Sequence, residues 1–225
     1  PSNENLELLL LREIKRLEKD LLGLDFNNRR RQNELLHNIP RPEAGEKVIE
    51  LQKFIRDIED DGLVRRPEIW KLAEGYLELL AGNYYFAAQS FGEVRNLTKN
   101  DTLLNQLDAF ELALQISDWA RADNEVEDQA ADIQRTSKTY RAYPDFPDFM
   151  RDKLTKLYRE SGDAGKAFLA QYSIQDLKIN SGERMVDNLL EICRARPIGC
   201  SLKPLISKCS ILIYYRQGSS HIHLG

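Results

Sequence analysis

The chain has 225 residues, of which 32 are basic and 36 are acidic, and its net charge is −4. This length suffices for one sizeable hydrophobic core or two smaller ones without help from disulfides or metal. The acidic balance counts against a general nucleic-acid binder, which normally carries a basic excess. No stretch approaches the roughly 20 apolar residues of a membrane span. We therefore expect a soluble protein without a membrane span and without nucleic acid as its partner.

The N-terminal region, 1–62, begins with a predicted helix over 5–24. Its apolar residues are spaced like heptad positions a and d; they are Leu10, Ile14, Leu17, Leu21 and Leu24. This seam covers barely two heptads, fewer than a stable coiled coil normally needs. The helix can pack on the rest of the chain, which we favour, or it can pair with a second copy and make the protein a homo-oligomer.

A second N-terminal helix is predicted over 43–60. Pro40 and Pro42 stop the preceding polar segment from continuing as a helix. Apolar residues then recur on one helical face; they are Val48, Leu51, Ile55 and Ile58. Asp60, Asp61 and Gly62 end this helix.

The next region, 63–196, contains one short pattern three times. A small residue is followed by Asn or Asp, and an alanine stands five positions after the small residue. The three pairs are Gly82 and Ala87, Ser117 and Ala122, and Gly162 and Ala167. The small residue lets one helix end tightly, and the Asn or Asp can cap the next helix. Because alanine lets antiparallel helix axes approach closely, the pattern predicts three helical hairpins.

These residues resemble the tetratricopeptide repeat, a helix–turn–helix unit of about 34 residues. The third copy matches best; its matching residues are Leu154, Tyr158, Gly162, Asp163 and Ala167. The closing proline of the family is absent from positions 99, 134 and 179, and the turns lie 35 and 45 residues apart. The resemblance implies an all-α solenoid of helical hairpins over about 67–180. A generic helical bundle is the alternative.

A capping helix is expected to begin at Ser181, carry Leu189 and end near Pro197. The last region, 197–225, is basic, with no acidic residue after Glu191. All three cysteines and two of the three histidines follow Glu191; they are Cys193, Cys200, Cys209, His221 and His223. Paired C-x2-C zinc spacing is absent. We therefore expect a poorly ordered tail, no metal site and no cofactor.

Catalytic signals are absent from the rest of the sequence. His37 is the one histidine before the tail, so no Ser/His/Asp or Cys/His arrangement is indicated. Phosphate-binding glycine loops and H-E-x-x-H are also missing. The chain opens at Pro1, as a processed form can, and its few cysteines fit either the cytoplasm or the periplasm. We expect a protein that is not an enzyme.

The resemblance implies a function in protein binding, because stacked helical hairpins present a curved inner surface to peptides or partner helices. The residues that it places on this surface are Asp152, Lys153, Lys156 and Arg159 in the third unit and Asp108, Glu111 and Gln115 in the second. The three cations favour an acidic partner. The alternative is an assembly subunit that oligomerises through helix 5–24, and an enzyme or metal-dependent regulator that uses the tail is a third hypothesis.

Overall fold

A computed structural model describes residues 4–22, 42–62, 64–172, 187–189 and 191–192 of the chain. All regular secondary structure in these residues is helical, which confirms the predicted all-α class. The chain divides into two compact units, Pro1–Asp118 (unit 1) and Trp119–Gly225 (unit 2). This division falls inside the predicted repeat region and not at residues 62 or 196.

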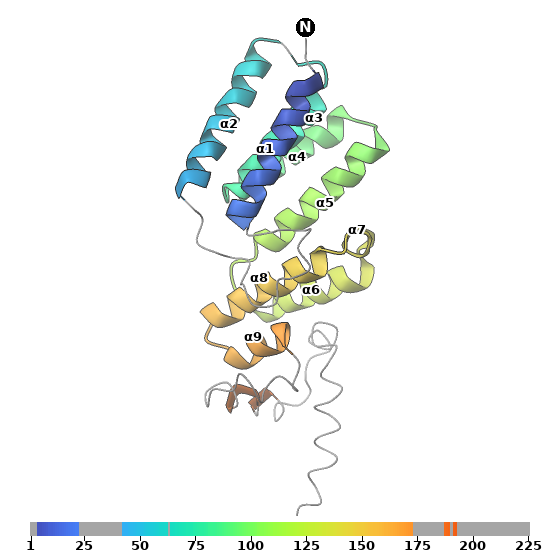
Figure 1. Ribbon diagram of the computed structural model, residues 1–225. Coiled ribbons are helices and arrows are strands. Elements are labelled where there is room, and N and C mark those ends of the chain that lie inside the picture. Colours follow the sequence, from blue (N-terminus) through green and yellow to red (C-terminus); the bar gives the residue numbers. More distant parts are fainter. Residues whose placement is uncertain (1–3, 23–41, 63, 173–186, 190, 193–225) are drawn as a thin grey trace, which may run out of the picture. The chain divides into compact units, whose positions relative to one another are not determined.

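Unit 1 contains five helices in its described residues. They are α1 (Glu4–Leu22), α2 (Pro42–Asp60), α3 (Pro67–Leu80), α4 (Tyr84–Leu97) and α5 (Asp101–Ser117). α3 lies at the centre of this unit and contacts each of the other four (Figure 1). Its apolar residues are buried on several sides, including Trp70, Leu77 and Leu79. The unit therefore has a single core organised around α3.

The two N-terminal helices follow the predicted pattern closely. α1 covers 4–22 where 5–24 was predicted, and α2 covers 42–60 where 43–60 was predicted. In α1, Leu10, Ile14 and Leu17 are buried in the core that this helix shares with α3. Leu24 lies outside the described residues. The heptad seam is thus used for packing inside unit 1.

The turn between α3 and α4 is closed by backbone hydrogen bonds around Gly82. Gly82 has φ 80°, and its amide donates to the carbonyl of Leu79 at 3.0 Å. The amide of Asn83 donates to the carbonyl of Glu78 at 2.9 Å. These two bonds form a Schellman motif, in which glycine is favoured because a side chain disfavours the left-handed conformation.

The two helices of this hairpin approach closely because small residues stand at their contact. Ala87 of α4 is fully buried. A Cβ atom built on Gly75 of α3 would lie 2.7 Å from Cε1 of Phe91 on α4. The absence of a side chain at Gly75 therefore makes room for the Phe91 ring.

Within residues 119–172, unit 2 contains four helices. They are α6 (Asn124–Thr136), α7 (Lys138–Ala142), α8 (Phe146–Glu160) and α9 (Ala164–Gln171). α8 and α9 form a second hairpin whose turn repeats the first. Gly162 has φ 80° and donates to Arg159, while the amide of Asp163 donates to Tyr158 at 2.8 Å. Ala167 of α9 is buried, as Ala87 is in α4.

The predicted hairpin at Ser117 and Ala122 is wrong in its details. Ser117 is the last, buried residue of α5, and Asp118 after it keeps a right-handed conformation. α6 begins only at Asn124, where the Asp123 side chain caps the helix by accepting from the amide of Val126. Ala122 therefore lies in the connection and not at a helix crossing. No glycine stands here to close a Schellman turn, and other residues adopt the left-handed conformation only at a cost.

Part of the predicted capping helix is described. Residues 187–189 and 191–192 are helical, and Leu189 is buried. A Cβ atom on Gly165 of α9 would lie 3.0 Å from the backbone nitrogen of Leu189, so this segment packs closely on α9. The predicted start at Ser181 and the whole tail, 197–225, lie outside the described residues.

Candidate functional site

The exposed side of α8 carries two neighbouring cations, Lys156 and Arg159. They are one helical turn apart, so their side chains lie on the same face of the helix. Nζ of Lys156 lies 3.8 Å from Oε1 of Glu160, which is a loose and exposed pair. Among the residues that the structure describes, no carboxylate forms an ion pair with Arg159. Met150, Leu154 and Leu157 hold α8 in place from its buried side.

The other two predicted residues of α8 are less accessible. Asp152 is buried, and its carboxylate accepts a hydrogen bond from Nε2 of Gln171 on α9. This aspartate therefore helps α8 and α9 to pack and does not line an open surface, which corrects the inner-face assignment made from the resemblance. Lys153 is half-buried and takes part in a polar interaction within the chain. Lys156 and Arg159 remain as the exposed pair.

The predicted residues of α5 lie in unit 1, whereas those of α8 lie in unit 2. Asp108 and Glu111 both bind Nη2 of Arg95 on α4, at 2.6 and 2.5 Å. Hydrogen bonds from Arg95 to Glu111 and Asp108 raise the pKa of this guanidinium above its ordinary value. Gln115 is exposed two turns further along α5. The acids predicted to face a ligand thus join α4 to α5.

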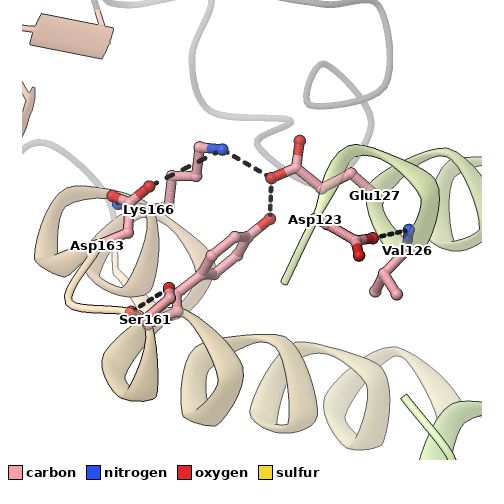
Figure 2. A network of polar contacts seen from close by, with 7 residues as sticks. Asp123, Val126, Glu127, Ser161, Asp163 and Lys166 are labelled. Carbon is pink, nitrogen blue, oxygen red and sulfur yellow. Dashed lines mark hydrogen bonds and ion pairs between the residues drawn. The ribbon is translucent and has the colours of Figure 1, made fainter. Parts of the chain in front are cut away.

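A buried polar cluster in unit 2 was not predicted from the sequence. The carboxylate of Glu127 on α6 accepts from the hydroxyl of Tyr158 on α8 at 2.9 Å and from Nζ of Lys166 on α9 at 2.8 Å. Figure 2 shows Oε1 of Glu127 at the point where the two contacts meet. Nζ of Lys166 also lies 5.5 Å from the centre of the Tyr158 ring. We name these three residues the Glu127 cluster.

The Glu127 cluster is suited to holding helices together. Burial, and then the charge and hydrogen bond of Glu127, raise the pKa of Tyr158 above its ordinary value. Glu127 is only 3% exposed, and a buried carboxylate is tolerated when cations and donors surround it. In the sequence, Tyr158 stands 31 positions and Lys166 stands 39 positions after Glu127. No local spacing in the sequence indicated that they would meet.

A second group of charges surrounds Lys71 of α3 in unit 1. Its Nζ lies 2.7 Å from the carboxylate of Glu74 and 3.3 Å from that of Glu93 on α4. Burial raises the pKa of nearby Glu59 on α2, and Lys71 opposes that shift. The described part of the chain contains no group of three or more side chains arranged to hold a metal ion. None of the described helices has both the length and the apolar composition that crossing a bilayer requires.

Comparisons of the chain with protein-family models, with curated proteins and with solved structures found no match.

Proposed function

We propose that the protein is a non-enzymatic interaction scaffold that binds an acidic segment of a partner protein, with Lys156 and Arg159 of α8 as the main contacts. The exposure of these two cations on one face of a well-anchored helix carries the proposal. A guanidinium presents a planar pair of donors that matches a carboxylate, and lysine adds a mobile point charge.

The spacing of the two cations suits an extended peptide. Residues three apart on a helix lie about 5–6 Å apart. Alternate side chains of an extended strand lie about 6.5–7 Å apart on one side. Two carboxylates at alternate positions of a peptide can therefore reach Lys156 and Arg159 together. Each exposed pair contributes only ~0.2–1 kcal/mol, so we expect binding to be weak and salt-dependent.

The repeat-like arrangement is also part of the proposal. The α3–α4 and α8–α9 hairpins have the same turn, with a left-handed glycine followed by Asn83 or Asp163 and a buried alanine four residues later. This shared local geometry supports a repeat relationship of the tetratricopeptide kind. Such helical pairs present side chains of their first helix, here α8, to a ligand.

The assembly-subunit alternative receives less support. Oligomerisation through the heptad seam requires Leu10, Ile14 and Leu17, and these side chains are already buried within unit 1. Pairing through the seam would have to displace α1 from the core of that unit.

A charge-reversal experiment tests the proposed site. The probes are a synthetic peptide of alternating Glu and Ser and its counterpart with Gln in place of Glu, titrated into the full chain at low salt. We expect binding of the Glu peptide alone, weakened about tenfold in the double variant K156E/R159E, which corresponds to about 1.4 kcal/mol. The matched control is K53E/R56E on α2, where two exposed cations have the same spacing. Equal loss in both variants, or equal binding of both peptides, would contradict the proposed site.

A further inference from the structure

α1 has two opposite faces of different character. One face packs into unit 1 beside α3 (Figure 1). The other presents Leu8, Leu11, Arg12 and Lys15, which follow the i, i+3, i+4, i+7 spacing of a single helical face. Leu8 is 65% exposed and Leu11 is 48% exposed, although burial of a leucine side chain is energetically favourable. We call these four residues the outer face of α1.

The charges of this helix leave its outer face basic. Three acids of α1 have described side chains, and each has a contact: Glu7 pairs with Arg66, Glu13 forms a loose pair with Arg16, and Glu18 contacts the hydroxyl of Tyr76. Arg12 and Lys15 are exposed, and no described side chain forms an ion pair with either of them. The outer face thus combines two apolar side chains with two cations that have no partner among the described residues.

We infer that the outer face of α1 is a docking surface for an amphipathic helix that carries acidic side chains. A partner helix can place apolar residues between Leu8 and Leu11 and flank them with Glu or Asp opposite Arg12 and Lys15. Helices commonly pair through such i, i+3, i+4, i+7 anchors, with flanking charges that select the partner. The combination of leucine and cation on one face therefore specifies the chemistry of the partner.

The same charges argue against a second copy as the occupant. Two outer faces packed against each other would bring two pairs of cations together, and like charges at an interface oppose association. Glu7 and Glu18 already have contacts within unit 1, which leaves them less able to offset this repulsion. An acidic helix gains the apolar contact and neutralises the cations.

This inference does not depend on the proposed function. It concerns α1 of unit 1 and an amphipathic helical ligand, whereas the proposed site concerns α8 of unit 2 and an extended acidic peptide. Variants at the two sites consequently separate the two ideas. R12E/K15E tests the outer face of α1, and K156E/R159E leaves that face unchanged.

The test uses two synthetic helical peptides of about three heptads. Both have Leu at positions a and d, and one has Glu at e and g where the other has Lys. We expect the full chain to bind the Glu peptide and not the Lys peptide. R12E/K15E should weaken this binding about tenfold or more. L8S/L11S should weaken it as well, while K53E/R56E and K156E/R159E should change it by less than about twofold.

Three results would overturn the inference. The first is equal binding of the Glu and Lys peptides, or no binding of either. The second is binding to mixed phosphatidylserine–phosphatidylcholine vesicles that R12E/K15E abolishes while the Glu peptide does not bind, which would assign the face to a membrane surface. The third is a dimer in sedimentation that L8S/L11S dissociates, which would assign it to a second copy. Because every substituted side chain is exposed or half-exposed, matching thermal unfolding curves will show that the variants fold.

Discussion

The hydroxyl of Tyr158 donates a hydrogen bond to the carboxylate of Glu127, and both residues are almost completely buried. One lies on α8 and the other on α6, so this contact connects two helices of unit 2 that are separated by a helix and two connections in the sequence. Lys166 of α9 completes the cluster. Substitutions in this cluster therefore test how the helices of unit 2 pack together.

Removal of the Tyr158 hydroxyl should destabilise unit 2. We expect Tyr158→Phe to lower the free energy of unfolding by ~1–3 kcal/mol, because Glu127 loses a donor inside the protein. The measurement is urea unfolding followed by Trp119 fluorescence in a Trp70→Phe background. Trp119 is buried in unit 2 and is then the one tryptophan left in the chain. Tyr143→Phe is the control, since Tyr143 is 36% exposed. Equal effects of the two substitutions would place the Tyr158 hydroxyl in water.

The stability of unit 2 should fall at alkaline pH, in part because of Tyr158. Burial and the neighbouring Glu127 raise the pKa of this phenol in the folded chain. Above the ordinary tyrosine pKa of about 10, the native state therefore binds more protons than the unfolded state, and the free energy of unfolding decreases as pH rises. This contribution is fully present below that pH. Unfolding at about pH 9 and pH 11 should show a steeper loss in the wild type than in Tyr158→Phe. Parallel losses would assign the alkaline sensitivity to other groups.

Gly75→Ala should destabilise unit 1 by ~1–3 kcal/mol through overpacking. The new Cβ would lie 2.7–2.9 Å from the Phe91 ring and from Cβ of Ser90, so α3 and α4 would have to separate. Gly92→Ala on α4 is the matched control, because no atom lies within 4 Å of its added Cβ. That change should stabilise the protein by ~0.4–1 kcal/mol. Trp70 fluorescence in a Trp119→Phe background reports both. A neutral Gly75→Ala would mean that the two helices are further apart than described.

Ala87→Leu and Ala122→Leu should differ, although both alanines belong to the predicted pattern. Ala87 is fully buried where α4 packs in its hairpin with α3, and a larger side chain there should cost ~1–3 kcal/mol. Ala122 lies half-buried in the connection before α6, where leucine should change stability by less than ~0.5 kcal/mol. Thermal unfolding of the two single variants makes the comparison. Similar costs would restore the helix crossing that was predicted at Ala122.

The helices of this protein could be predicted where periodicity and helix-end residues agree. α1 and α2 begin and end within two residues of their predicted bounds, and the α3–α4 and α8–α9 turns contain the glycine that a tight reversal needs. At Ser117 the pattern had a small residue but no glycine. Small size alone does not make a left-handed conformation favourable, and the connection there is longer.

The candidate site was less predictable, because exposure depends on which helix covers which face. Asp152 and Lys156 stand one turn apart on α8, yet α9 covers the first and leaves the second exposed. The Glu127 cluster depends on three helices meeting, and no spacing within one helix signals that contact. The leucines on the outer face of α1 are part of a run, Leu8–Leu11, that surrounds the helix. The heptad pattern placed Leu10 in the buried seam, but it predicted no role for Leu8 and Leu11.

The Schellman turns at Gly82 and Gly162 have a consequence for mutational tolerance. Both turns are closed by main-chain amides and carbonyls, so the exposed Ala81 contributes little that another residue could not supply. Ser161 differs, because its hydroxyl also donates to the carbonyl of Tyr158 at 3.0 Å. In a library that samples every substitution at these positions, the two glycines should tolerate fewer replacements than Ala81, because both have positive φ. The variants that still fold would therefore reveal the positions of both turns.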